Sequence, residues 1–188
     1  EVKTTTSTDY ILWVDANLAS LKTDWVIKRN LKYTIAPDKS FGVAQDKDGR
    51  LVATAEMTYN HTGVFDWRTS RYRTYARVFV PAGAELLSYD GAMKWDRTVG
   101  KGEVEQGSEL GKHWFGAFIA IEPGKTGKLS FTYLLPEKVS NQIKSSLYTI
   151  LVQKQLGLTE MGLTIEPKFG TTTSTVLQTD KQFEFYVD

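Results

Sequence analysis

A row of arginines and aromatic residues in the middle of the chain offers the strongest chemistry. Four guanidinium groups lie within ten residues, and the candidate ligand-binding residues are Trp67, Arg68, Arg71, Arg73, Tyr75 and Arg77. Side chains two residues apart on a strand share a face, so this row would place its members about 7 Å apart in succession. Guanidinium groups bind carboxylates and phosphates through paired hydrogen bonds, and Tyr and Trp rings stack on sugars. The row therefore predicts recognition of an anionic ligand or a glycan.

The same row also fits an ordinary solvated face of a sheet. One face of an antiparallel sheet commonly meets water, and arginines on it pair across strands with Glu or Asp. Both interpretations place the row on a strand. The two interpretations differ in whether the guanidinium groups bind a ligand or pair with acidic side chains of the protein.

A pair of carboxylates supplies a catalytic alternative. Glu103 and Glu105 would share a face if their segment is a strand, and glycoside hydrolases use two carboxyl groups about 5–10 Å apart. One carboxyl must be desolvated so that it stays protonated, whereas the residues flanking this pair are mainly Gly and Lys. We therefore expect no enzyme, and a carbohydrate hydrolase using this pair is the weaker alternative.

The remaining motifs indicate structure rather than catalysis. The chain has no Cys and two His, which removes disulfides and thiolate zinc sites. No Gly-x-Ser-x-Gly elbow accompanies His61 or His113. Residues 124–126 lack the upstream Gly of a phosphate loop, and residues 46–49 lack the further oxygen ligands of a calcium loop. We expect neither a cofactor nor a metal ion.

Length and charge narrow the class of protein. The 188 residues fall in the range of about 100–200 that is common for one domain. Lys plus Arg number 23 and Asp plus Glu number 22, so the net charge is +1 and no broad positive field attracts nucleic acid. No apolar run approaches the roughly 18–20 residues of a membrane helix, so we expect no membrane insertion by this segment.

Most of the chain alternates with a period of two, which is typical of strands. Over residues 25–35 the side chains expected to face inward are Trp25, Ile27, Arg29, Leu31, Tyr33 and Ile35. Further strands are expected at 10–14, 51–59, 71–80, 113–121, 129–135, 147–153, 163–166 and 183–187, with a short helix within 136–146. Residues 96–112 are expected to form a loop or a mobile hairpin, and residues 171–175 a loop. The pattern predicts an all-β fold, a single-domain antiparallel β-sandwich of about nine strands over residues 9–188. Residues 1–8 are expected to be a linker or frayed terminus.

Four stretches carry a family resemblance; they are Asp15–Arg29, Arg73–Gly83, Phe131–Pro136 and Tyr148–Gly157. In order and spacing they resemble the C-terminal region of a bacterial family of membrane-anchored envelope proteins of unknown function. The pattern is sharpest at Asn17, Lys22, Arg77 and Pro81. The resemblance implies an extracytoplasmic, β-rich domain with an anchor N-terminal to Glu1. It implies no reaction and no catalytic residues.

Together these inferences predict a non-catalytic cell-envelope module that acts in binding or assembly at the cell surface through the arginine row. Its expected partners are an anionic cell-wall polymer or glycan and other domains of the parent protein. The alternative from another class is a structural spacer within a larger anchored protein. An internal Lys–Asn or Lys–Asp crosslink stays open, with Lys22, Lys28 and Lys32 as candidate lysines.

Overall fold

The computed structural model describes residues 2–3, 7–19, 21–37, 50–96 and 101–187. Within these ranges the chain forms twelve strands: β1 (Asp9–Asn17), β2 (Ile27–Pro37), β3 (Leu51–His61), β4 (Tyr72–Pro81), β5 (Glu85–Asp90), β6 (Glu105–Glu109), β7 (Lys112–Ile121), β8 (Thr126–Leu134), β9 (Leu147–Gln153), β10 (Met161–Pro167), β11 (Thr173–Leu177) and β12 (Lys181–Tyr186). Short helical turns are η1 (Lys22–Val26), α1 (Glu137–Ser140) and η3 (Asn141–Ser145). The sequence of residues 37–40 is expected to end the strand before it, and β2 ends at Pro37. Residues 38–40 and the tight turn expected at 46–49 lie outside the described residues.

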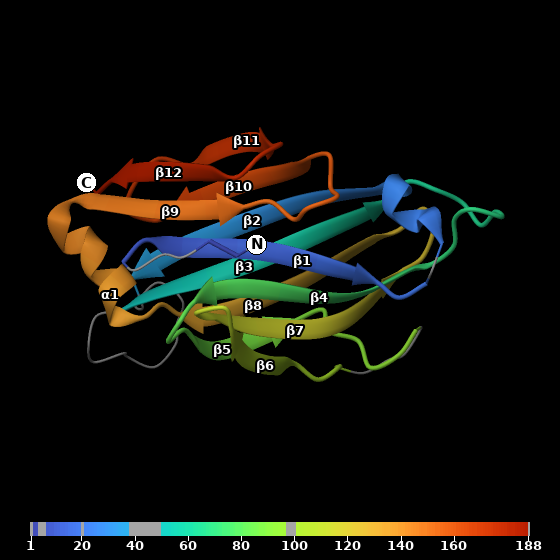
Figure 1. The fold of residues 1–188 in the computed structure, drawn as a ribbon, viewed down its shortest axis with the longest axis horizontal. Coiled ribbons are helices and arrows are strands. Elements are labelled where there is room, and N and C mark those ends of the chain that lie inside the picture. Colours follow the sequence, from blue (N-terminus) through green and yellow to red (C-terminus); the bar gives the residue numbers. More distant parts are fainter. Residues whose placement is uncertain (1, 4–6, 20, 38–49, 97–100, 188) are drawn as a thin grey trace.

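The strands form two packed sheets of six strands each, as Figure 1 shows. Sheet A has the order β12-β9-β1-β4-β7-β6, and sheet B has the order β11-β10-β2-β3-β8-β5. Most neighbours are antiparallel, but β1 runs parallel to β9 and β10 runs parallel to β2. The predicted all-β, single-domain sandwich is confirmed, with twelve strands in the described residues where about nine were expected.

The core lies between the sheets and follows the predicted alternation. On β2, Leu31, Tyr33 and Ile35 are fully buried. The neighbouring strand β3 in the same sheet buries every second residue from Leu51 to Tyr59. Arg29 also faces inward and is only 7% exposed. Trp25 was expected to belong to this inward set, but it is 80% exposed because η1 interrupts the extended chain before β2 begins.

The outer face of sheet A carries a second, smaller apolar cluster. It is formed by Tyr10, Leu12 and Phe79, and Val2 packs against it. The Lys3 amide donates to Gln153 Oε1 at 3.1 Å, and its ammonium lies 2.9 Å from Asp180. The segment expected to be a linker or frayed terminus therefore contacts the sandwich at its described residues 2–3.

Loops meet at the two ends of the elongated sandwich (Figure 1). One end carries η1 together with the β3–β4 loop at residues 62–71, and the other carries α1 and the C-terminal end of the chain. Among the described residues, no helix has the length and apolar character needed to cross a membrane.

Candidate functional site

The predicted arginine row lies on β4, in the middle of sheet A. Arg73, Tyr75 and Arg77 project from its outer face, opposite the buried Tyr72, Thr74, Ala76 and Val78. Arg71 comes immediately before the strand and is 8% exposed. Trp67 and Arg68 lie in the β3–β4 loop, so the structure does not align them with the rest of the row.

Acidic side chains meet the row from Arg71 to Arg77. Arg71 bonds to Glu122 Oε1 at 2.5 Å and to Asp96 Oδ2 at 3.1 Å, and Arg73 bonds to Asp96 Oδ2 at 2.6 Å. The hydrogen bond to Glu122 raises the pKa of Arg71, so this guanidinium stays charged. The arginines are therefore paired across strands and loops, as the solvated-face interpretation expects.

Farther along β4, the row is aromatic as well as charged. The Arg77 guanidinium lies 4.3 Å from the Trp114 ring centroid and 5.6 Å from that of Tyr75, and it lies 3.9 Å from Glu109. The Tyr75 hydroxyl donates to Glu105, and burial together with this bond raises the pKa of Tyr75 to about 12. This part of the face consequently carries rings and balanced charges rather than an excess of positive charge.

Two glycines allow these rings to lie flat on the sheet. A Cβ on Gly116 would stand 2.8 Å from the Tyr75 hydroxyl oxygen, and one on Gly107 would stand 2.8 Å from the Trp114 ring. Both distances are below van der Waals contact, so any larger residue there would lift the ring above it. The neighbouring strands β6 and β7 thus shape the aromatic surface beside β4.

A hollow of about 520 Å³ adjoins the Arg73 end of the row. It is lined by Leu18, Arg73, Lys94, Trp95, Asp96 and Phe118. The Trp95 indole is 65% exposed, so it offers a broad apolar surface beside the Arg73–Asp96 ion pair. Sequence reasoning missed Trp95, although a Trp flanked by Lys94 and Asp96 in a polar segment was a usable signal.

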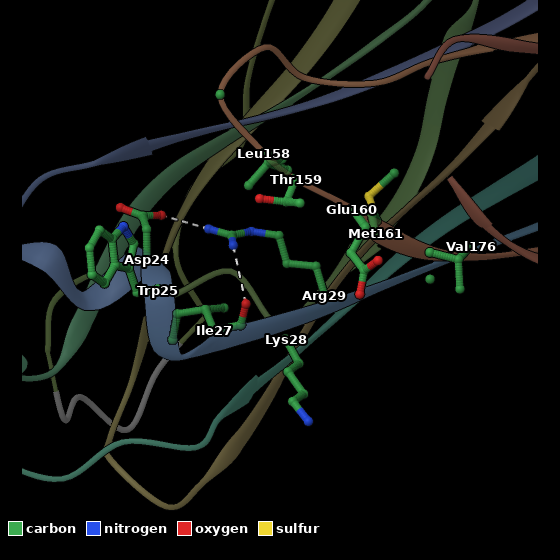
Figure 2. A pocket seen from close by; sticks show the side chains of 12 residues that line it. Asp24, Trp25, Ile27, Lys28, Arg29, Leu158, Thr159, Glu160, Met161 and Val176 are labelled. Carbon is green, nitrogen blue, oxygen red and sulfur yellow. Dashed lines mark hydrogen bonds and ion pairs between the residues drawn. The ribbon is translucent and has the colours of Figure 1, made fainter. Parts of the chain in front are cut away.

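A second hollow, of about 450 Å³, opens between η1, the start of β2 and the loop that leads into β10 (Figure 2). Trp25, Leu158 and Thr159 line it, and the Arg29 guanidinium reaches it from below. Arg29 is already bonded there, since it lies 2.7 Å from Asp24 Oδ1. This hollow therefore has an exposed indole at its rim and a saturated ion pair at its base.

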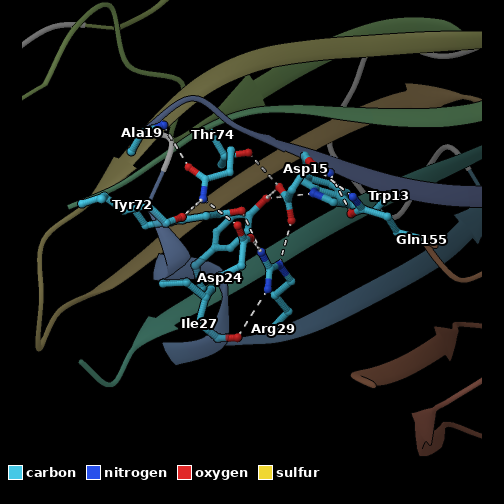
Figure 3. A network of polar contacts seen from close by, with 12 residues as sticks. Trp13, Asp15, Ala19, Asp24, Ile27, Arg29, Tyr72, Thr74 and Gln155 are labelled. Carbon is cyan, nitrogen blue, oxygen red and sulfur yellow. Dashed lines mark hydrogen bonds and ion pairs between the residues drawn. The ribbon is translucent and has the colours of Figure 1, made fainter. Parts of the chain in front are cut away.

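That ion pair belongs to a buried network that joins the two sheets (Figure 3). Arg29 on β2 donates to Asp15 on β1 at 2.8 Å and to the Tyr72 hydroxyl on β4 at 2.7 Å. Asp15 also accepts from the Tyr59 hydroxyl on β3 at 2.6 Å, and Trp13 Nε1 donates to that hydroxyl at 2.8 Å. The network holds Asp24, and with it η1, against the end of the sandwich.

The opposite end of β1 buries a second carboxylate, Asp9, which is fully inaccessible. The Tyr33 hydroxyl donates to Asp9 Oδ2 at 2.7 Å, the Tyr148 hydroxyl donates to the same oxygen, and the Tyr10 amide donates to Oδ1 at 2.7 Å. Burial raises the pKa of Asp9 to about 6, although these bonds partly offset it. Sequence reasoning did not single out either buried Asp.

The remaining candidates from the sequence, the carboxylate pair and the crosslink lysines, are all exposed. Glu103 and Glu105 are both exposed, so neither has the desolvated setting that the hydrolase hypothesis needs. Lys22, Lys28 and Lys32 are exposed too, so these candidate crosslink lysines lack apolar surroundings. Within the described ranges, no group of three or more His, Cys, Asp or Glu side chains is arranged to hold a metal ion.

Comparison with known proteins adds little. No protein-family model matches the chain, and no curated protein matches it significantly. Among solved structures, an M1 zinc metallopeptidase from Deinococcus radiodurans is 13% identical with a TM-score of 0.28, covering 93% of this chain and 42% of the peptidase. A mutant of that peptidase gives a TM-score of 0.29 at 13% identity, covering 85% of this chain and 38% of its own. The chain thus spans about two fifths of these peptidases, and TM-scores this low assign it neither a family nor an activity.

Proposed function

We propose that this chain is a non-catalytic module of the cell envelope that binds a glycan on the outer face of sheet A. The observation that carries the proposal is the hollow where the Trp95 ring, 65% exposed, lies beside the Arg73–Asp96 pair. Sugars present both apolar ring faces and hydroxyl groups. An indole stacks on the former, and a paired guanidinium and carboxylate offer donors and acceptors to the latter.

The charges favour an uncharged glycan over an anionic polymer. The three cations of the row, Arg71, Arg73 and Arg77, form ion pairs with three carboxylates, those of Asp96, Glu109 and Glu122. A fourth carboxylate, Glu105, accepts from the Tyr75 hydroxyl. A polyanion would have to displace the three paired carboxylates before it could bind the arginines. An uncharged glycan binds through hydroxyl groups and ring stacking, so it does not have to displace the carboxylates from the arginines.

The envelope location and the absence of catalysis extend the same proposal. The family resemblance of the four sequence stretches supports an extracytoplasmic site of action. The exposed setting of Glu103 and Glu105 supports binding rather than glycoside hydrolysis. A structural spacer is the competing function, and it predicts that the outer face of sheet A has no ligand.

Replacing Trp95 with Ala tests the proposal directly. We expect the wild-type domain to sediment with purified peptidoglycan at low and at high salt, because the balanced charges leave little electrostatic attraction to screen. Trp95→Ala should weaken that binding about tenfold through loss of ring stacking and buried apolar area. The measurement is a co-sedimentation isotherm for each variant.

Trp67→Ala is the matched control, since Trp67 is 83% exposed and lies outside the hollow. It should bind peptidoglycan like the wild type. Binding that disappears at high salt, and that Arg73→Gln weakens more than Trp95→Ala, would instead support the anionic ligand. A wild type that does not bind at either salt would favour the spacer.

A further inference from the structure

A cluster of exposed apolar side chains covers one end of the sandwich. Six of the eleven large hydrophobic residues that are exposed in the described chain lie on the segment 17–26 and the β3–β4 loop. They are Leu18 (55% exposed), Leu21 (39%), Trp25 (80%), Val64 (65%), Phe65 (61%) and Trp67 (83%). We call this surface the apolar tip. Exposed clusters of this kind commonly mark interaction sites.

The two segments of the apolar tip form one surface because their backbones are bonded together. The Lys22 amide donates to the Arg68 carbonyl at 3.0 Å, and the Thr62 amide donates to the Val26 carbonyl at 2.8 Å. The Ser70 amide also donates to the Thr23 hydroxyl at 3.2 Å. Residues 36 to 47 positions apart in the sequence therefore share a single edge of the molecule.

The apolar tip is also held firmly from below. Asp24 in η1 is tied to Arg29 at 2.7 Å, as Figures 2 and 3 show. In the other loop, Asp66 Oδ1 accepts from the backbone amides of Arg68 at 2.7 Å and Thr69 at 2.6 Å. The exposure of the apolar side chains thus belongs to an ordered loop pair whose acidic groups are engaged within the fold.

The cations of the apolar tip lie against its indoles. Lys22 Nζ is 5.6 Å from the Trp25 ring centroid, and the Arg68 guanidinium is 5.1 Å from that of Trp67. Within the described part of the chain, no ion pair joins an acidic side chain to Lys22, and Arg68 is attracted by Asp66 two residues earlier in the same loop. The exposed Lys125 lies in the adjacent β7–β8 turn, which bonds to the His61 backbone. Asp24 is partly exposed and bonded to Arg29, and the exposed Asp66 accepts from backbone amides of its own loop, whereas the exposed Lys22, Arg68 and Lys125 present their charges to solvent.

We infer that the apolar tip docks on an anionic lipid surface. Trp rings are favoured at the boundary between hydrocarbon and headgroups, aliphatic side chains enter the acyl region, and Lys and Arg contact anionic headgroups. The apolar tip places three aliphatic side chains, Leu18, Leu21 and Val64, beside its rings, whereas Leu18 is, among the described residues, the one aliphatic residue that lines the Trp95 hollow. The outward cations match an anionic surface, which a protein partner need not offer.

Docking of this kind does not cross the bilayer. Side chains that bind at the interface reach about 5–10 Å into the boundary between headgroups and acyl chains. This docking therefore needs no segment that spans the membrane. The apolar tip lies at the end of the sandwich opposite α1 and the C-terminal end (Figure 1). Leu18 belongs to the apolar tip and also lines the Trp95 hollow, so the two surfaces adjoin at this residue.

The test is co-sedimentation of the domain with vesicles made of equal parts phosphatidylcholine and phosphatidylglycerol. We expect the wild type to bind, and the double variant Trp25→Ala with Trp67→Ala to bind about tenfold or more weakly. The control is Tyr186→Ala, which removes an aromatic ring that is 76% exposed on β12. It should bind vesicles like the wild type, and all variants should unfold at similar temperatures.

A second experiment tests whether the cations of the apolar tip contact anionic headgroups. Lys22→Glu with Arg68→Glu should weaken binding to the mixed vesicles more than the same change affects binding to pure phosphatidylcholine. A wild type that ignores both vesicles, or a Trp25/Trp67 variant that binds them undiminished, overturns the inference. Dimerisation through the apolar tip without vesicle binding would also overturn it and would assign the surface to a protein contact. Peptidoglycan binding by Trp95 is tested separately and does not depend on this outcome.

Discussion

Replacing Arg29 with Met should lower the free energy of unfolding by about 3–5 kcal/mol at neutral pH. The Arg29 side chain is 3% exposed and its partner Asp15 is 2% exposed, so the substitution leaves a carboxylate buried without a counter-charge. The remaining donors to Asp15, the Tyr59 and Thr74 hydroxyls at 2.6 and 3.3 Å, are neutral and cannot replace a guanidinium. Equilibrium denaturation in urea measures the loss.

Removing both charges of the Arg29–Asp15 pair should cost less stability than removing the arginine alone. The double variant Asp15→Leu with Arg29→Met should be more stable than Arg29→Met alone, because removing both charges removes the desolvation penalty. Lys28→Met changes the neighbouring exposed residue and should stay within about 0.5 kcal/mol of the wild type. A loss below about 1 kcal/mol for Arg29→Met would mean that water reaches Asp15 and that the network does not isolate it.

The sequence predicts the place of Arg29 but not its partners. Alternation along residues 27–35 put its side chain inward among Ile27 and Leu31, and the structure agrees. Asp15 approaches from the other sheet, and no periodicity within one strand specifies which strand packs opposite it. The same limit applies to the acids facing the arginine row, since Asp96 and Glu122 come from separate loops.

Two strands, β5 and β11, escaped the sequence analysis, and β6 lies in the segment that was expected to be a loop or a mobile hairpin. The Thr-rich segment of β11 has the β-branched residues of a strand, but its low complexity favoured a loop. β6 contains Gly107 and charged residues that are typical of loops, and it forms because it pairs with β7 at the edge of sheet A. β5 likewise pairs only with β8 at the edge of sheet B. Edge strands bury one side at most, so their hydrophobic pattern is weak.

Trp25 and Trp95 show how sequence reasoning misplaced the exposed aromatics. Alternation predicts that Trp25 continues the inward face of β2, but η1 begins at Lys22 and turns the ring to solvent. Trp95 comes immediately before the segment 96–112 and was not considered as a residue on which a ligand could stack. Large apolar residues are most often buried, so the departures from that rule are what marks both surfaces for function.

The Asp9 carboxyl should make the domain less stable as the pH rises from about 4 to about 6. Its pKa rises from 3.8 to about 6 on folding, so in this window the folded state keeps a proton that the unfolded state has lost. Proton binding by the folded state stabilises it, and that stabilisation fades until both states are ionised above about pH 6. The shift corresponds to about 3 kcal/mol.

The variant Asp9→Asn isolates this contribution, because an amide keeps an acceptor for the Tyr33 and Tyr148 hydroxyls but does not titrate. The free energy of unfolding of the wild type, minus that of Asp9→Asn, should fall by about 2.4 kcal/mol between pH 4 and 7, because part of the total of about 3 kcal/mol is already lost at pH 4. Taking the difference cancels the other carboxyls, whose titration changes both proteins alike. Urea denaturation at a series of pH values provides the measurement.

Tyr148→Phe sharpens the same experiment. The Tyr148 hydroxyl donates to Asp9 and lowers its pKa, so deleting it should raise the pKa of Asp9 further and carry the loss of stability to higher pH. Burial raises the pKa of Asp9 and the hydrogen bond from Tyr148 lowers it. Comparison of Tyr148→Phe with Asp9→Asn separates the two effects. Parallel curves for the wild type and Asp9→Asn would mean that the buried carboxyl is ionised throughout. The nearby Lys112 ammonium would then have to offset the desolvation that burial among tyrosines imposes.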